Sequence, residues 1–398
     1  MTASEIISLE QQYMLQTYRR PEFVLAGGEG VWVWDDRGRR YLDAVAGIAV
    51  NALGYQHEAV GSAIVEAARG LIHVSNLYYT GPQARLAREL VEAVPFADRV
   101  FFCNSGAEAV EGALKFARKF ARANHGEGKS TIVAFTGSFH GRTAGALAVT
   151  STEKYRAPFE PLLPGVRFAP FNDIEGARQM ISDDVCAVIV EPVQGEGGVS
   201  PARVEFLQTL RQDCDRTGAL LIFDEVQCGL GRTGTLCAHE PSGVAPDLMT
   251  LAKPLAGGLP MGAILLTQAV ADVMEPGDHA STFAGGALVS SVARAVLAEI
   301  NRPEFLAGVR AKGELLARKL DELVAASPLA AGKRGLGLMW GVETTIDAVQ
   351  IVNAAYEQGL LVVIAGPNVV RLVPPLIISE AEIEALVERL TAAFRACE

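Results

Sequence analysis

Short apolar runs alternate with longer helical patterns from about residue 54 to about residue 267. Five runs are almost continuously apolar, at Val100–Cys103, Thr131–Phe135, Cys186–Val190, Ala219–Phe223 and Ala263–Leu266. Such runs are typical of strands that are buried on both faces of a sheet. Between them, segments such as Pro82–Ala93 and Ala107–Ala123 carry apolar residues at helical spacing. The alternation predicts an α/β fold with a mainly parallel sheet covered by helices.

The two ends of the chain follow a different pattern. The elements expected there are a helix at Ile6–Thr17, hairpin strands at Gly30–Trp34 and Arg40–Leu42, strands at Arg334–Glu343 and Leu360–Ile364, and a final helix at Glu380–Ala396. A long helical pattern after Val289 precedes the later strands. We therefore expect a large α/β domain over residues 54–288 and a smaller α+β domain over residues 289–398. The N-terminal segment, residues 1–53, is expected to pack with the small domain.

The composition narrows the possible partners. Of 398 residues, 49% are hydrophobic and 20% are charged, which is typical of a globular chain. The net charge of −11 argues against nucleic acid and membrane surfaces as partners. The six cysteines form no C-x-x-C pair, so neither a disulfide framework nor a metal site is expected. The chain has no signal-like start and no membrane-length apolar run, so we expect a cytoplasmic location.

Three features, in chain order, suggest one kind of chemistry. A strand is expected to end and a helix to begin at Ser105, Gly106 and Ala107. This segment is either an anion site built from free N–H groups or an ordinary serine cap of the helix. Asp224 closes an apolar strand, either to bind a cation or to cap a helix. Lys253 lies in an apolar loop rich in Gly and Pro, either as a nucleophilic amine or as a solvated charge. Together they match pyridoxal phosphate, which needs a phosphate site, a partner for the ring nitrogen and an amine for a Schiff base.

One glycine pattern is not assigned to this chemistry. The segment Gly229–Gly234 fits G-x-G-x-x-G, the pattern of dinucleotide-binding loops. It follows a strand that already ends in Asp224, and no strong helical pattern comes directly after it. We interpret it as a loop whose glycines adopt positive φ angles.

Further motifs fall in an order and spacing that identify a family. They are Ser75–Tyr79, Phe101–Ala107, Ser138–Arg142, Val190–Gly198, Asp224–Gln227 and Ala252–Lys253. With these motifs the chain resembles the class III, fold-type-I aminotransferases that use pyridoxal phosphate, and among them most closely the acetylornithine aminotransferases. The resemblance covers nearly the whole chain. It implies that the large, mainly parallel α/β/α domain binds the cofactor and that the C-terminal domain is smaller and α+β.

The resemblance also implies a role for each matching residue around the cofactor. Lys253 would bind the cofactor covalently and move a proton, Asp224 would keep the ring nitrogen protonated, and Phe139 would stack on the ring. The remaining cofactor contacts that it implies are Ser105, Gly106, Ala107, Glu225, Val226, Gln227 and Thr282 of the partner subunit. The position of Thr282 implies a homodimer with active sites at the interface.

For the substrates, the resemblance implies two arginines. Arg142 would bind the distal carboxylate of both substrates, because a guanidinium matches a carboxylate in a bidentate manner. Glutamate has a second carboxylate, which Arg371 would bind, and Glu196 would mask Arg371 while the δ-amine donor is present. Ser281 is a further expected substrate contact. The implied reaction moves the δ-amino group of N2-acetylornithine to 2-oxoglutarate, a step in arginine biosynthesis.

Alternatives remain open at this stage. The runner-up donors are succinylornithine, acetyl-lysine or carrier-linked lysine, ornithine and 4-aminobutyrate, since all of these share the Arg142 site. Glutamate-1-semialdehyde aminomutase fits less well, because a mutase has no evident need for Arg371 paired with Glu196. A non-catalytic pyridoxal phosphate sensor would need neither carboxylate site, although Arg371 and Glu196 also suit a structural ion pair.

Two local features carry further expectations. Gly286 and Ala287 replace an Asn and a Pro that are common in the family, which predicts a looser phosphate loop near Thr282. Pro254 directly follows Lys253 and predicts an extended backbone at the lysine.

Overall fold

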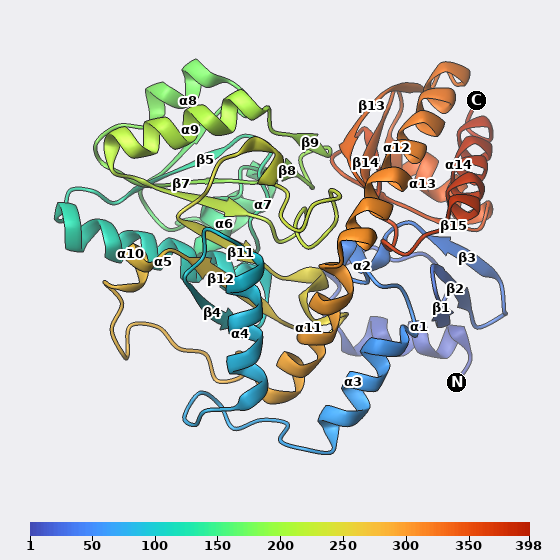
Figure 1. The fold of residues 1–398 in the computed structure, drawn as a ribbon. Coiled ribbons are helices and arrows are strands. Elements are labelled where there is room, and N and C mark those ends of the chain that lie inside the picture. Colours follow the sequence, from blue (N-terminus) through green and yellow to red (C-terminus); the bar gives the residue numbers. More distant parts are fainter.

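A seven-stranded sheet forms the centre of the molecule in the computed structural model, which describes residues 1–398 (Figure 1). Its strands are β4 (Arg99–Cys103), β5 (Thr131–Phe135), β6 (Val166–Ala169), β7 (Val185–Val190), β10 (Leu220–Asp224), β11 (Leu248–Leu251) and β12 (Gly262–Leu266). They lie in the order β4-β12-β11-β10-β7-β5-β6, and β12 runs antiparallel to both of its neighbours. The predicted α/β fold with a mainly parallel sheet is confirmed.

Helices cover both faces of this sheet, as continuously apolar strands require. In Figure 1, α8 (Ile174–Met180) and α9 (Val204–Thr217) lie on one face and α5 (Gly106–His125) on the other. Along β10, Ile222 packs in the cluster that contains α5, whereas Leu221 and Phe223 pack in the cluster that contains α9. The strand therefore buries side chains in two separate layers.

The other helices of the large domain lie around these layers. They are α3 (Glu58–Ala68), α4 (Gly81–Ala93), α6 (Ala144–Ala148), α7 (Glu153–Arg156), α10 (Gln268–Ala271), α11 (Ala287–Ile300) and the 3-10 turns η1 (Ala157–Phe159), η2 (Glu240–Ser242) and η3 (Lys253–Ala256). A two-stranded ribbon of β8 (Val193–Gln194) and β9 (Ser200–Pro201) lies beside the main sheet. No helix is both long enough and apolar enough to cross a membrane.

The C-terminal part forms a second, smaller layered unit. Its sheet has the order β13-β14-β17-β16, with β13 (Ala330–Leu336), β14 (Met339–Thr344), β16 (Val363–Ile364) and β17 (Val369–Leu372). Its helices are α12 (Pro303–Ala326), α13 (Ala348–Glu357) and α14 (Glu380–Arg395). In α14, Ser379 and Glu382 form a capping box, which fixes the start of the helix.

The N-terminal elements join this smaller unit through a shared sheet. They are α1 (Ala3–Tyr13), β1 (Leu25–Glu29), β2 (Trp32–Asp35), β3 (Arg40–Asp43) and α2 (Ala46–Ala49). The C-terminal strand β15 (Leu360–Leu361) pairs in parallel with β3, so the N-terminal hairpin lies beside the C-terminal unit (Figure 1). The division of the chain at residues 53 and 288 stays a prediction.

Several element boundaries differ from the predictions. The strand expected at Arg334–Glu343 is a hairpin of β13 and β14, because Gly337 turns the chain with a φ of +58°. The strand expected at Leu360–Ile364 is divided between two sheets. Strands β6 and β11 were not predicted, because Arg167 and Thr250 interrupt their apolar runs.

The Gly229–Gly234 segment is a loop, as predicted. Gly231 and Gly234 have φ angles of +86° and +94°. Arg232, between them, is 1% exposed and donates hydrogen bonds to the carbonyl oxygens of Leu338 (3.0 Å) and Pro374 (2.5 Å). The loop therefore ties the large domain to the small one through a buried guanidinium.

Candidate active site

A cavity of about 450 Å³ opens at the carboxyl ends of the parallel strands. Ligands of open α/β sheets bind at this edge, because the loops that follow neighbouring strands converge there. The residues that line it are Val50, Asn104, Ser105, Gly106, Ala107, Phe139, His140, Gly141, Arg142, Glu191, Asp224, Val226, Gln227, Ala252, Lys253, Gly258, Leu259, Pro260 and Met261. Most of the predicted cofactor contacts are therefore brought together.

The first turn of α5 forms one wall of the cavity. Ser105 caps the helix by accepting a hydrogen bond from the backbone N–H of Glu108 (3.2 Å). At Gly106, a Cβ atom would lie 2.7 Å from the Val226 side chain, so glycine is required for this close approach. The N–H groups of a first helical turn have no partner within the helix. The serine cap and the anion site are thus compatible, and a phosphate fits at this helix terminus.

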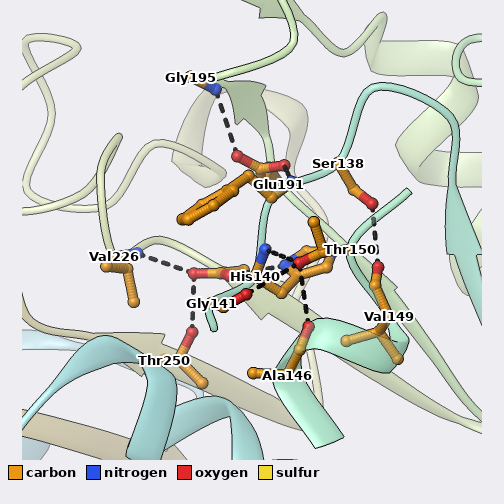
Figure 2. Close-up of polar contacts among 12 residues, drawn as sticks. Ser138, His140, Gly141, Ala146, Val149, Thr150, Glu191, Gly195, Val226 and Thr250 are labelled. Atoms are coloured by element: carbon orange, nitrogen blue, oxygen red, sulfur yellow. Dashed lines mark hydrogen bonds and ion pairs between the residues drawn. The ribbon is translucent and has the colours of Figure 1, made fainter. Parts of the chain in front are cut away.

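Asp224 is the last residue of β10, and three neighbours fix its environment. Its Oδ1 accepts hydrogen bonds from the Val226 N–H (3.1 Å) and the Thr250 hydroxyl (3.0 Å). Its Oδ2 lies 2.7 Å from Nδ1 of His140. Figure 2 shows Val226, Thr250 and His140 arranged around this carboxylate. Because Asp224 is only 4% exposed, these contacts hold a single orientation towards the cavity.

His140, to which the sequence assigned no role, is the buried support of Asp224. Its backbone N–H donates to Oγ1 of Thr150 (2.9 Å), which in turn donates to the carbonyl of Ala146 (3.0 Å). Burial disfavours a proton on the ring, but the hydrogen bond and negative charge of Asp224 outweigh it and raise the pKa of His140. The imidazole therefore holds Oδ2 of Asp224 in place from the buried side.

Lys253 lies opposite, where β11 passes into η3. Its φ angle is +36°, so the extended backbone predicted from Pro254 is wrong: the turn that aims the side chain at the cavity overrides the local preference. Burial lowers the pKa of Lys253 from 10.5 to about 8, and the positive charge of Arg371 acts in the same direction. A useful fraction of the amine is therefore uncharged near neutral pH, as a nucleophile requires.

Aromatic rings hold the Arg142 guanidinium at the cavity wall. Its Cζ lies 3.6 Å from the centre of the Tyr155 ring and 5.5 Å from that of Phe139. No carboxylate of the chain forms an ion pair with it, in contrast to Arg371. Arg142 is thus positioned by cation–π contacts and keeps its fork of N–H donors for a ligand carboxylate.

Arg371, on β17 of the small domain, is paired with Glu196. Its Nη1 donates hydrogen bonds to Oε1 of Glu196 and to Oε1 of Gln227 (3.1 Å). Although burial opposes ionisation, the charge of Arg371 keeps the pKa of Glu196 below its usual value. Arg371 is 1% exposed, and its Nε has no partner. The pair lies beside the cavity, because Gln227 lines it.

Three predicted residues lie elsewhere. Glu225 does not line the cavity: its oxygens accept from the backbone N–H groups of Ala238 and His239 (2.6 and 2.9 Å), so its side chain anchors that loop. Ser281 accepts a hydrogen bond from Asn104 (2.9 Å) but lines a different hollow. Thr282 is exposed outside the cavity.

The residues present fit pyridoxal phosphate. The helix terminus, where Gly106 leaves room, matches the phosphate of the cofactor. The fixed carboxylate of Asp224 matches the ring nitrogen, and the desolvated amine of Lys253 matches the aldehyde. Glu191 belongs to the Val190–Gly198 motif but had no expected role; it lines the cavity, and burial raises its pKa to about 7. Its place directly after β7, matching that of Asp224 at the end of β10, is a signal that could have revealed it.

Comparisons with known proteins agree with this chemistry. A family model described as aminotransferase class-III matches residues 13–394. A protein named acetylornithine aminotransferase, mitochondrial, from Alnus glutinosa is 51% identical over 98% of this chain and 87% of its own length. The structure of the ornithine aminotransferase from Toxoplasma gondii ME49 superimposes with a TM-score of 0.96 at 31% identity, over 100% of this chain and 96% of that one. The structure of the N-acetylornithine aminotransferase from Stenotrophomonas maltophilia K279a superimposes with a TM-score of 0.85 at 40% identity, over 98% of this chain and 99% of that one.

Proposed function

The chain belongs to the class-III aminotransferases, which use pyridoxal phosphate, and from this premise we propose that it moves the δ-amino group of N2-acetylornithine to 2-oxoglutarate. The products are N-acetylglutamate 5-semialdehyde and glutamate, and the reaction belongs to arginine biosynthesis. The relative from Alnus glutinosa, at 51% identity, supports this choice of donor.

The observation that carries the proposal is the contrast between the two arginines. Arg142 has no carboxylate partner, whereas Arg371 is paired with Glu196. N2-acetylornithine presents one carboxylate, far from the reacting carbon, so it needs only Arg142. Glutamate presents a second carboxylate on the reacting carbon and needs Arg371 as well. One arginine that is always available and one that is masked suit this alternation of substrates.

The chain's own residues position and move protons in this reaction. Pyridoxal phosphate, when bound, supplies the carbon that accepts the amino group and a ring that spreads negative charge. Lys253 would accept a proton at Nζ from the donor carbon and deliver it to the cofactor carbon that receives the amino group, a role that its pKa of about 8 suits. Asp224, fixed by His140 and Thr250, favours a proton on the ring nitrogen. Phe139 and Arg142 hold the ring and the distal carboxylate.

Single-turnover spectroscopy on the cofactor-loaded protein tests the donor. We expect N2-acetylornithine to change the cofactor absorbance at least about tenfold faster than ornithine, N2-acetyl-lysine or 4-aminobutyrate, since tenfold corresponds to only about 1.4 kcal/mol of differential binding. Equal rates with the lysine compound would mean that one enzyme serves two pathways. A bound cofactor with no reaction on any amine would instead support the sensor alternative and contradict the proposal.

A homodimer is part of the proposal. Apolar side chains are exposed beside Thr282, with Leu77 at 79%, Tyr78 at 70% and Phe283 at 66% exposure. Such a patch is typical of a surface that a partner covers. Since Thr282 lies outside its own cavity, it is free to reach the phosphate site of the partner subunit. Gly286 and Ala287 begin α11 directly after this loop.

Hybrid dimers test whether Thr282 acts across the interface. When Lys253→Ala and Thr282→Ala proteins are unfolded, mixed and refolded together, each hybrid contains one site with both natural residues. We expect the mixture to regain wild-type cofactor affinity in about a quarter of its sites, as random pairing gives. Equilibrium dialysis against pyridoxal phosphate measures this fraction. A mixture that behaves as the average of its two components would contradict the shared site.

A cytoplasmic location remains a prediction of the sequence. It is tested by fractionating cells and assaying the compartments, which matters because one relative is named as mitochondrial.

A further inference from the structure

Glu191 is a buried carboxylate that the proposed reaction does not use. It directly follows Val190, the last residue of β7, and Val190 pairs with Phe223 of the neighbouring strand β10. Glu191 and Asp224 therefore lie next to each other at the edge of the sheet. Glu191 is only 6% exposed, and a carboxylate at such a place needs hydrogen-bond donors.

The two oxygens of Glu191 bind two different loops. Oε2 accepts a hydrogen bond from the backbone N–H of Phe139 (3.1 Å), and Oε1 accepts one from the backbone N–H of Gly195 (3.2 Å). Figure 2 shows Glu191 between Gly195 and the segment that carries Ser138 and His140. One loop carries the ring-stacking Phe139, and the other carries Glu196, the residue that masks the second arginine.

Neighbouring contacts leave these loops little room to shift. Gln194 donates from Nε2 to the carbonyl of Thr136 (2.9 Å). A Cβ atom at Gly197 would lie 2.3 Å from the carbonyl oxygen of Gly137, and one at Gly195 would lie 2.2 Å from Oε1 of Gln227. The backbone on both sides of Glu196 is thus packed against fixed groups, whereas its own side chain is 29% exposed.

We propose that Glu191 is a positioning residue that fixes the Phe139 loop and the Glu196 loop to each other, so that Arg371 is unmasked by rotation of the Glu196 side chain and not by movement of its loop. The inference rests on the proposed function, because it deepens the role given to Glu196. A carboxyl group has an acceptor oxygen for each of the two N–H groups, whereas a glutamine in its place would turn an NH2 donor towards one of them.

The first test uses Glu191→Gln in the cofactor-free protein. We expect hydrogen–deuterium exchange to become about tenfold faster in the peptides that cover residues 136–141 and 193–198, because a hydrogen bond to a charged group is lost. Glu111→Gln is the matched control. Oε1 of Glu111 accepts hydrogen bonds from the backbone N–H groups of both Gly145 and Ala146, and a glutamine keeps this one acceptor oxygen. Unchanged exchange in both peptides of the Glu191 variant would overturn the proposal.

The second test measures substrate preference in the loaded enzyme. Glu196→Ala removes the group that masks Arg371 and should raise kcat/KM for glutamate relative to kcat/KM for N2-acetylornithine. The size of this change is the reference for the other variants. Glu191→Gln should shift the ratio in the same direction by at least about threefold, and Glu111→Gln should leave it unchanged. An unaltered ratio in Glu191→Gln would refute the positioning role. If Glu191→Gln does not fold, Glu191→Asp, which keeps the charge but is one methylene shorter, is measured in its place by the same criteria.

The two proposals fail in different ways. A wild-type protein that converts neither N2-acetylornithine nor glutamate would contradict the proposed function, whereas the exchange rates would still decide whether Glu191 joins the two loops.

Discussion

Replacing Lys253 with alanine is expected to lower the rate of amino-group transfer by about 10⁴-fold or more, while the fold is retained. Lys253 is the sole amine that lines the cavity, and its lowered pKa provides the uncharged form that accepts a proton. General acid–base catalysis by a positioned group contributes up to about 10⁴-fold, and loss of the covalent attachment adds to this. Steady-state rates with N2-acetylornithine and 2-oxoglutarate measure the effect.

A second buried lysine provides the control. Lys129 donates from Nζ to the carbonyl oxygens of Thr217 (2.6 Å) and Asp183 (3.1 Å), far along the sheet from the cavity. Lys129→Ala should lower the thermal midpoint but leave kcat/KM close to the wild-type value. Thermal unfolding of both variants separates a folding defect from a loss of chemistry. Normal turnover by Lys253→Ala would be incompatible with the proposed mechanism.

Replacing Arg142 with alanine is expected to lower kcat/KM for both substrates by about 10²- to 10³-fold. A bidentate guanidinium–carboxylate contact is lost in each half-reaction, and charged hydrogen bonds of this kind contribute about 1.5 to 3 kcal/mol each. Arg142→Lys should recover only part of the loss, because an ammonium cannot form the paired geometry. The two half-reactions are measured separately by single turnover.

The matched control for Arg142 is Arg156, whose Cζ lies 4.5 Å from the centre of the Phe168 ring outside the cavity. Arg156→Ala removes a guanidinium from an aromatic face and should leave both half-reactions unchanged. An Arg142 variant that loses only one half-reaction would show that the distal carboxylates of the two substrates bind at different places.

Strands β4, β5, β7 and β10 were predictable from their apolar runs alone, whereas β11, which leads to Lys253, was not. Asp224 was placed correctly at a strand end, because a polar residue that closes a buried run must lie at the sheet edge. The role of His140 was not predicted. Its hydrogen bond to Asp224 joins positions 84 residues apart, and the periodicity of the sequence carries no information on such contacts. The pairing of Arg371 with Glu196 was expected only through the family resemblance, because it joins two domains.

Local rules failed where the tertiary structure imposes a conformation. The proline after Lys253 favours an extended lysine, but the chain must turn there to bring the amine into the cavity, so φ is +36°. Glu225 belongs to a motif whose other residues line the cavity, yet its carboxylate is turned away to bind the Ala238–His239 backbone. A motif therefore fixes which segment lies at a site but does not fix the direction of every side chain.

Placing Arg371 on a strand of the small domain has an evolutionary consequence. The groups that bind the cofactor and move protons, such as Asp224 and Lys253, belong to the central sheet and its loops, whereas Arg371 comes from β17. Mutations in the small domain can therefore alter which amino acids are accepted without disturbing the reaction itself. New substrate preferences can arise by drift in one module while selection preserves the other.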